Sequence, residues 1–293
     1  MSGVIALTGA SGFTGRFVQR TFETAGYSVV GLSASTGCDL TDPDQIRDSF
    51  RNLHAIYEHP PDGVIHLAAE SYVAADSLNS FYETNVIGTQ NLLMALDTDA
   101  PPNKVIVASS ANVYGNNPEP NLTEQTPRRP VNHYGASKVA MEALIEGNWM
   151  HRLPIVITRP FNYTGTGQKA HFLVPKLVQH FRARSASIDL GNLDVVRDFS
   201  DVRVIAQQYL RLFECDSSGE PVNLCSGIGY SLATIMDMLE DLSGHSMDIH
   251  TDQTLIRHDE ISSLIGSTER LEQIIGDDLS TDIRELLKWM LTE

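Results

Sequence analysis

The chain has 293 residues, of which 42% are hydrophobic and 20% charged, as in ordinary globular proteins. It carries 37 acidic and 21 basic residues, and its formal net charge of −16 disfavours nucleic-acid binding because a polyanion would be repelled. No apolar run approaches the roughly 20 residues of a membrane-spanning helix, and three cysteines without paired spacing favour a reduced, cytoplasmic protein with neither disulfides nor a metal site.

The first 160 residues alternate short, β-branched apolar runs with amphipathic stretches. The runs predict buried parallel strands at residues 4–7, 28–32, 64–67, 105–108 and 155–158. The stretches between them predict helices, the clearest at 15–25, 43–57, 80–95 and 133–150. Such alternation is typical of right-handed crossovers, and it predicts a Rossmann-type, doubly wound α/β sheet.

From about residue 161 the alternation becomes less regular. Loops rich in glycine and polar residues are expected at 162–169, 191–198 and 217–221, and helices at 232–242 and 281–291. We therefore expect a dinucleotide-binding domain at 1–160, joined by returning elements at about 200–230. A smaller, mixed α/β substrate-binding region would occupy residues 161–293.

A glycine-rich turn follows the first predicted strand and opens a helix. Its residues include Gly9, Ser11, Gly12, Phe13 and Gly15. Glycines at this spacing permit a tight turn and close approach of the backbone to a pyrophosphate, which the helix N-terminus then attracts. The position between a strand and a helix, near the N-terminus, predicts binding of NAD or NADP.

The end of the second predicted strand bears on the choice between the two cofactors. No acidic residue follows it to grip an adenosine ribose, and no arginine follows it to pair with a 2′-phosphate. Because this end is small and neutral, it leaves room for the 2′-phosphate and weakly favours binding of NADP, or of both NADP and NAD. Asp39 and Leu40 are candidates for contacts with the adenine side of the cofactor, although Asp39 could equally be a solvated loop residue.

Tyr134 and Lys138 are four residues apart in a predicted helix, so their side chains share one face. A tyrosine has an ordinary pKa near 10, and an adjacent cation would lower it enough for acid–base work near neutrality. Ser110 follows the fourth predicted strand, at the sheet edge where open α/β sheets bind their ligands. We predict that these three residues form a catalytic centre for hydride chemistry.

Six motifs in chain order carry a resemblance to a known family. They are Thr-Gly-x-x-Gly-Phe-x-Gly from Thr8, His-Leu-Ala-Ala from His66, Asn-Val-x-Gly-Thr from Asn85, Ser-Ser-x-x-Val-Tyr-Gly from Ser109, Tyr-x-x-x-Lys from Tyr134, and Arg-Pro-Phe-Asn from Arg159. Together they resemble the extended short-chain dehydrogenases that act on nucleotide sugars. The resemblance runs essentially from end to end and implies Ser110, Tyr134 and Lys138 as the catalytic residues.

The resemblance also implies roles for residues around that centre. Asn85 would support the site, and Asn162 would touch the diphosphate of the substrate. The backbone of Leu67, Ala68 and Ala69 would contact the cofactor, whereas the His66 side chain is better interpreted as strand packing. The family further implies a homodimer formed through two helices of each subunit.

Two later segments resemble enzymes of GDP-sugars, namely the GDP-mannose 4,6-dehydratases and the GDP-4-keto-6-deoxymannose reductases. The first contains Arg197 and the second contains Arg257 and Glu260. The arginines suit phosphate contacts, and Glu260 could accept a hydrogen bond from a ribose or base. Two residues depart from the family pattern: His258 replaces a proline, and Val204 stands where an aspartate is usual.

The residues after Ser110 restrict the reaction. Ala111 and Asn112 provide neither the acid and base that dehydration needs nor the cysteine of the 3,5-epimerases. A 4-keto reductase or a 4-epimerase remains, and the resemblance to GDP-sugar enzymes implies NAD(P)H-dependent reduction of GDP-4-keto-6-deoxy-D-mannose to GDP-6-deoxy-D-mannose (GDP-D-rhamnose) or its C4 epimer. Two alternatives are a nucleotide-sugar 4-epimerase that retains NAD and a non-catalytic NAD(P)-binding regulator.

Overall fold

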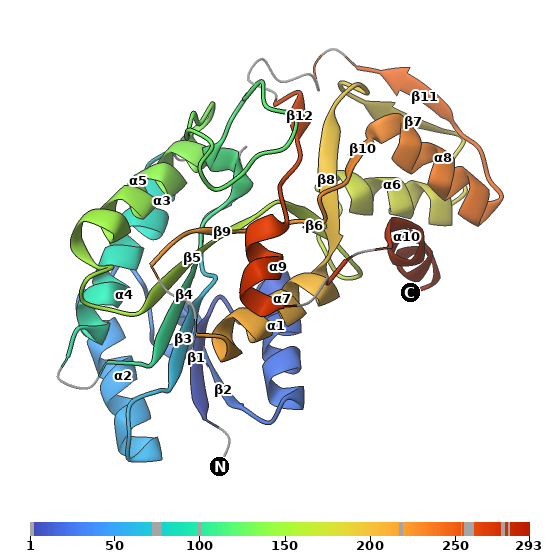
Figure 1. Ribbon diagram of the computed structural model, residues 1–293. Coiled ribbons are helices and arrows are strands. Elements are labelled where there is room, and N and C mark those ends of the chain that lie inside the picture. The colour runs from blue at the N-terminus through green and yellow to red at the C-terminus, as the bar shows by residue number, and fades with distance from the viewer. Residues whose placement is uncertain are drawn as a thin grey trace.

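The computed structural model describes residues 3–71, 78–98, 101–216, 219–252, 254, 261–276, 279–280 and 282–293. Its centre is a six-stranded parallel sheet in the order β2-β1-β3-β4-β5-β9 (Figure 1). The strands are β1 (Val4–Thr8), β2 (Ser28–Leu32), β3 (Gly63–His66), β4 (Lys104–Ala108), β5 (Ile155–Pro160) and β9 (Val222–Leu224). The five predicted strands are confirmed to within two residues, and so is the Rossmann-type fold class.

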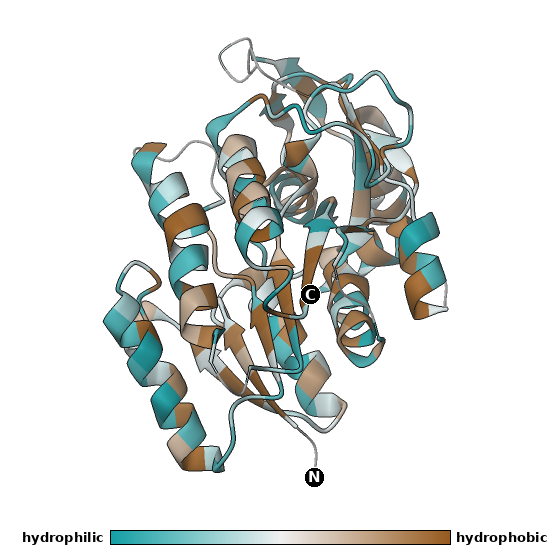
Figure 2. Ribbon diagram, turned by 60° about the vertical axis from the view of Figure 1, so that its left-hand side comes forward, coloured by the Kyte–Doolittle hydropathy of each residue, from teal (hydrophilic) through white to brown (hydrophobic). Residues whose placement is uncertain are grey.

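Helices cover both faces of this sheet because side chains alternate along each strand. Ile5 and Leu7 pack with α1 (Phe13–Thr24), α7 (Val202–Glu214) and α9 (Glu269–Ile275). Ala6, between them, belongs to the core on the opposite face, with α2 (Pro43–Tyr57), α4 (Thr89–Leu96) and α5 (His133–Asn148). Figure 2 shows the apolar strands of the sheet with helices of mixed hydropathy beside them.

The helix predicted at 80–95 is divided into three pieces. It consists of α3 (Leu78–Tyr82), a π-helical turn η2 (Glu83–Gly88) and α4. A π-turn inserts an extra residue into the helix and shifts the direction of the side chains that follow. Hydrophobic periodicity does not signal this shift, so the sequence predicted one continuous helix.

The remaining elements form a second group beside the main sheet (Figure 1). It contains α6 (Leu173–Arg182), α8 (Leu232–Ser243) and α10 (Ile283–Thr292), whose apolar faces pack together, and the strands β6 (Asn162–Thr164), β7 (Ser187–Leu190), β8 (Val196–Asp201), β10 (Gly229–Ser231), β11 (Asp248–Thr251) and β12 (Ser263–Leu264). The loop predictions at 162–169 and 191–198 are partly wrong because β6 and the start of β8 lie there. These short strands pair across long stretches of sequence, which local composition does not reveal.

The strand order reverses next to β1. From β1 the chain continues to β2 on one side and then crosses to β3 on the other side of β1. In open parallel sheets, the crevice outside the carboxyl ends of the strands at such a reversal is where ligands bind. The glycine-rich turn and residues 67–69 both lie at this edge, directly after β1 and β3 respectively.

Candidate active site

The turn between β1 and α1 is too tightly packed for side chains at Gly9 and Gly15. Gly9 has φ of +73°, and a Cβ atom on Gly15 would lie 2.1 Å from the Gly9 carbonyl oxygen. Gly12 is the N-cap of α1, where no side chain caps the helix and no acidic residue lies in the first turn. Ser11 is exposed at the turn, and Phe13 begins the helix. The uncapped N–H groups therefore fit a pyrophosphate, as a nicotinamide dinucleotide requires.

The end of β3 lies against this turn. A Cβ atom on Gly9 would approach the Ala68 nitrogen to 2.8 Å, and the Ala68 N–H donates to Thr8 Oγ1 at 3.2 Å. Leu67 and Ala69 flank this contact in the chain that follows β3. The predicted cofactor residues after β1 and β3 are therefore brought together at the carboxyl edge of the sheet, where the strand reversal leads us to expect the binding crevice.

His66 is a packing residue, in agreement with its interpretation from the sequence. Its two ring nitrogens lie 2.7 Å from Thr8 Oγ1 and 2.9 Å from Thr89 Oγ1. Burial, aided by the positive charge of Lys138, lowers the pKa of His66 to about 3. The ring therefore stays neutral and ties β1 to α4 beneath the crevice.

The chain after β2 contains the residues predicted to contact the adenine side of the cofactor. A short 3₁₀ turn, η1 (Ala34–Thr36), follows Ser33, whose hydroxyl lies 2.9 Å from that of Ser35. Asp39 is half-buried, and its carboxylate accepts hydrogen bonds from the Thr41 N–H at 2.9 Å and the Thr41 hydroxyl at 2.8 Å. Leu40 is buried. This segment carries the hydroxyl groups of Ser33 and Ser35 and one carboxylate, that of Asp39.

The structure brings Ser110, Tyr134 and Lys138 together at the carboxyl end of β4. Ser110 is the N-cap of a short 3₁₀ turn, η3 (Ala111–Val113), and Tyr134 lies in the first turn of α5. The N-cap of α5 is Asn132, whose side chain accepts the Gly135 N–H at 2.8 Å. This capping fixes where the helix begins and hence where Tyr134 stands relative to the strand end.

Lys138 is buried one helical turn after Tyr134. Its ammonium group donates to the Ala108 carbonyl oxygen at 2.7 Å, at the last residue of β4. Burial lowers the pKa of Lys138 to about 8, while the negative charge of Glu142 acts in the opposite direction. The amine is therefore mostly protonated at neutral pH and is anchored to the strand end that carries Ser110.

The electrostatics of Tyr134 differ from the expectation that Lys138 lowers its pKa. Burial raises the pKa of Tyr134 to about 12, and a hydrogen bond from Ser110 acts in the opposite direction. The sequence could not show how much of the phenol would lose contact with water. A raised pKa keeps the phenol protonated at neutral pH, which is the form that a proton donor needs.

Asn85 links the catalytic helix to the chain after β3. It lies in the π-helical turn η2, where its side chain accepts the Glu70 N–H at 2.9 Å and donates to the Glu70 carbonyl at 3.0 Å. The same amide donates to Ser137 Oγ at 3.0 Å, and Ser137 donates to the Tyr134 carbonyl at 2.8 Å. Asn85 therefore connects the segment after β3 to the first turn of α5, which carries Tyr134.

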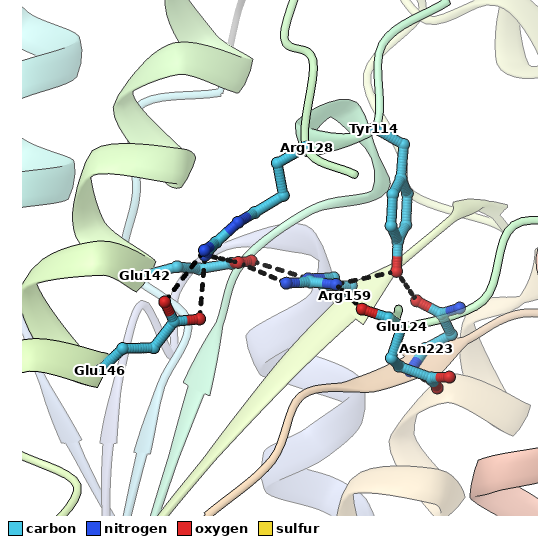
Figure 3. Close-up of polar contacts among 7 residues, drawn as sticks. All are labelled: Tyr114, Glu124, Arg128, Glu142, Glu146, Arg159 and Asn223. Atoms are coloured by element: carbon cyan, nitrogen blue, oxygen red, sulfur yellow. Dashed lines mark hydrogen bonds and ion pairs between the residues drawn. The ribbon is translucent and has the colours of Figure 1, made fainter. Parts of the chain in front are cut away.

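A buried ionic network supports α5 from behind (Figure 3). Glu142 accepts two hydrogen bonds from Arg159 at 3.0 and 2.7 Å, and Arg128 reaches both Glu142 and Glu146. Arg159 also donates to the Tyr114 hydroxyl at 3.1 Å. The network joins the catalytic helix to β5 and to the segment that carries Ser110.

Sequence analysis gave no role to Glu142 or Ser137. The available signal was an acid among apolar residues, four positions after Lys138 on the same helix face. Arg159 was noted only as part of a motif. An acid that would otherwise be buried without a partner predicts a nearby cation.

The predicted substrate residues lie in part on the small sheet beside the crevice. Asn162 is exposed in β6, opposite Phe199 of β8, and Arg197 lies two residues earlier in β8. The Arg197 guanidinium donates to the Val196 carbonyl at 2.9 Å. Arg257 and Glu260 lie outside the described residues.

The described part of the chain can be compared with three absences expected from the sequence. Within it, no group of three or more histidine, cysteine or acidic side chains could hold a metal ion. None of its helices combines the length and apolar character needed to cross a bilayer. The three cysteines are unpaired.

Comparison with known proteins places this geometry in context. Residues 5–225 match the NAD dependent epimerase/dehydratase family. GDP-6-deoxy-D-talose 4-dehydrogenase of Aggregatibacter actinomycetemcomitans is 36% identical, over 98% of this chain and 96% of its own. GDP-6-deoxy-D-mannose reductase of Pseudomonas aeruginosa is 30% identical, over 98% of this chain and 95% of the reductase. The solved structure of RMD from Pseudomonas aeruginosa complexed with NADPH superposes with a TM-score of 0.87 at 30% identity, covering 99% of this chain and 98% of that one.

These findings confirm the resemblance drawn from the six motifs. They also confirm, for the family, the prediction of a nicotinamide dinucleotide cofactor.

Proposed function

The chain belongs to the NAD dependent epimerase/dehydratase family, and we propose that it reduces the 4-keto group of GDP-4-keto-6-deoxy-D-mannose with NADPH or NADH. The product would be GDP-6-deoxy-D-mannose or its C4 epimer, GDP-6-deoxy-D-talose. The names of the two relatives described above support this substrate class, since those two sugars differ only at C4.

One observation carries the proposal: a serine, a tyrosine and an anchored lysine converge at the carboxyl end of β4. The Ser110 hydroxyl is a neighbour of Tyr134 that lowers the pKa of the phenol, and Lys138 is fixed to the Ala108 carbonyl at 2.7 Å. The glycine turn after β1 and the backbone after β3 form the neighbouring crevice. This arrangement suits transfer of a hydride and a proton to one carbonyl group.

When bound, a reduced nicotinamide dinucleotide supplies the hydride. Tyr134 donates its phenolic proton to the carbonyl oxygen, where negative charge develops. Ser110 donates a hydrogen bond to the same oxygen. The ammonium group of Lys138 stabilises the phenolate that remains on Tyr134 after proton transfer. The raised pKa of Tyr134 keeps the phenol protonated before the reaction, and the charge of Lys138 would offset the weaker acidity that this raised pKa brings.

The residues after Ser110 support reduction over the other reactions of nucleotide sugars. Ala111 has no ionisable group, and Asn112 carries an amide that neither gives up nor accepts a proton near neutral pH. Elimination of water from the sugar would need an additional acid and base at this point. Simple reduction needs only the proton of Tyr134.

We assign the nucleotide end of the substrate to the side of the crevice next to β6 and β8. There Asn162 would contact the diphosphate, and Arg197 would pair with a phosphate. The roles of Arg257 and Glu260 toward the nucleotide rest on the sequence resemblance alone.

We further propose that NADPH is accepted at least as well as NADH. The hydroxyls of Ser33 and Ser35, after β2, provide neutral donors for a 2′-phosphate, and no acidic residue of η1 would repel it. Calorimetric titration with each reduced cofactor tests this proposal. A dissociation constant for NADH more than tenfold below that for NADPH would contradict it.

The proposed homodimer is supported by exposed apolar side chains along α3 to α4. Tyr82, Ile87 and Met94 are between 36% and 56% exposed on these consecutive helical segments. Met94→Lys is expected to weaken a dimer, whereas Ile56→Lys, at an exposed position on α2, leaves it intact. Sedimentation velocity measures both variants, and a monomeric unmodified protein would refute the dimer.

The direct test of the proposed reaction supplies the product of a GDP-mannose 4,6-dehydratase and follows consumption of NAD(P)H. We expect turnover that Tyr134→Phe lowers by about 10²- to 10⁴-fold, the usual contribution of a general acid. Tyr57→Phe, at the end of α2, is the matched control and should retain activity. The coupling between H3 and H4 in the product distinguishes 6-deoxymannose, with a large value, from 6-deoxytalose, with a small one.

The 4-epimerase alternative predicts a different result from the same preparation. Purified protein carrying stoichiometric NAD, active on a UDP- or GDP-hexose without added cofactor, would refute the reductase. A regulator without catalysis predicts no turnover of either kind.

A further inference from the structure

Asn112 makes two contacts with the hydroxyl of Ser110. The Asn112 backbone N–H donates to Ser110 Oγ at 3.2 Å, and its side-chain Nδ2 donates to the same oxygen at 3.2 Å. Both donors come from one residue, in the short turn η3 that Ser110 caps. The backbone contact is the capping bond of η3, whereas the side-chain contact has no role assigned so far.

A serine hydroxyl has one proton to donate and two lone pairs that accept. The two bonds from Asn112 occupy both lone pairs of Ser110, so its single proton must point in the remaining direction. We assign this direction to Tyr134, the neighbour whose pKa the Ser110 hydroxyl lowers. Ser110 is buried, which leaves little access for water to replace these partners.

The backbone of Asn112 is itself fixed in place. A Cβ atom on Gly135 would lie 2.7 Å from the Asn112 carbonyl oxygen, so the first turn of α5 packs directly on η3. Ala111 and Val113, on either side, are buried. Asn112 therefore has little freedom to move away from Ser110.

We propose that Asn112 is a positioning residue that holds Ser110 as a hydrogen-bond donor toward the oxygen of the reacting sugar. The inference rests on the proposed function, in which that oxygen lies between Ser110 and Tyr134. A carboxylate at residue 112 would have the opposite effect, because it would accept the Ser110 proton and turn the lone pairs toward the substrate. An amide rather than a carboxylate at residue 112 therefore favours simple reduction of the 4-keto group.

The decisive variant is Asn112→Asp, which keeps the size of the side chain and replaces its donor by an acceptor. We expect kcat to fall by about 10²-fold, as when one donor to a developing oxyanion is lost, with KM changed less than threefold. The pKa of Tyr134 should rise because the variant loses the Ser110 proton and gains a nearby negative charge. The alkaline limb of the kcat profile for reduction should therefore move to higher pH.

Asn112→Ala removes only the side-chain donor and keeps the backbone donor, so a smaller loss of kcat is expected. Asn148→Asp is the matched control, since Asn148 lies at the exposed end of α5 and bonds only its own helix in the contacts described. An Asn112→Asp variant whose kcat is within twofold of that of the unmodified protein, or in which only KM increases, would overturn the inference. An increase in KM alone would mean that Asn112 binds the sugar instead.

A neutron crystal structure of the deuterium-exchanged protein tests the orientation without any turnover. We expect deuterium on Asn112 Nδ2 facing Ser110 Oγ, and the Ser110 deuterium directed toward Tyr134. An Asn112 amide turned so that Oδ1 faces Ser110 would overturn the inference, whichever substrate the enzyme uses. Absence of turnover on the 4-keto sugar, together with the expected deuterium positions, would refute only the proposed function.

Discussion

Substitution of Gly15 by alanine tests whether the turn after β1 binds the cofactor through its backbone. The new Cβ atom would lie 2.1 Å from the Gly9 carbonyl oxygen and 2.7 Å from Ala10 Cα, whereas ordinary contacts begin at 3.4 Å. Both neighbours are backbone atoms, so the turn itself must move by about 1 Å.

A displacement of that size breaks hydrogen bonds from the turn to a pyrophosphate, because a donor and acceptor about 4 Å apart no longer interact strongly. Hydrogen bonds to a charged group contribute about 1.5 to 3 kcal/mol each. Loss of one bond therefore predicts binding of NADPH weakened by about 10- to 100-fold. Titration of cofactor fluorescence measures the dissociation constant.

Two further glycines make the test quantitative. A Cβ atom on Gly12 would lie 3.1 Å from the Gly9 oxygen, so Gly12→Ala should weaken binding only a few-fold. Gly147, on α5, has no atom within 4 Å of a new Cβ, and Gly147→Ala should bind normally while favouring the helix by about 1 kcal/mol. Circular dichroism checks that each variant is folded. A folded Gly15→Ala protein that binds NADPH as tightly as Gly147→Ala would refute the reasoning.

Two predictions concern the charged groups around α5. Between pH 8 and 10.5 the unfolded chain keeps the Lys138 proton, whereas the folded protein has released it. The free energy of unfolding should therefore rise with pH. From pH 7 to pH 10 we expect a rise of about 2 kcal/mol in the unmodified protein relative to Lys138→Met. Urea unfolding at both pH values measures this change, and no rise would mean that the amine is not desolvated. Glu142→Gln should lower the free energy of unfolding by about 3 to 5 kcal/mol because it leaves Arg159 buried without its carboxylate. Glu146 is more exposed on the same helix, so Glu146→Gln should lower the free energy of unfolding by less than about 1 kcal/mol. Equal effects of the two glutamine substitutions, again by urea unfolding, would contradict this account of the network.

The central sheet was predictable because its strands are short, nearly continuous runs of β-branched residues, whose spacing between helices allows few topologies. The glycine turn and the pair Tyr134 and Lys138 were found for a related reason, since local spacing fixes their geometry. The geometry of such motifs depends only on residues that are close together in the sequence.

Other features depend on contacts between distant parts of the chain. The π-helical turn that positions Asn85 produces no signal in the hydrophobic periodicity of the sequence. The strands β6 and β8 can be recognised only from their pairing in the folded protein. The partner of Glu142 lies 17 residues away on β5. The raised pKa of Tyr134 depends on how completely the folded protein surrounds the phenol, which spacing alone does not give.

The central claim is that the chain transfers one hydride to C4 of a 4-keto GDP-sugar. The most direct measurement supplies NADPH deuterated on the transferred position, together with GDP-4-keto-6-deoxy-D-mannose, and examines the product by mass spectrometry and proton NMR. We predict one deuterium per molecule, located at C4, with one NADPH oxidised for each product formed. Product without deuterium at C4, or conversion of a nucleotide sugar without net oxidation of NADPH, would contradict the account.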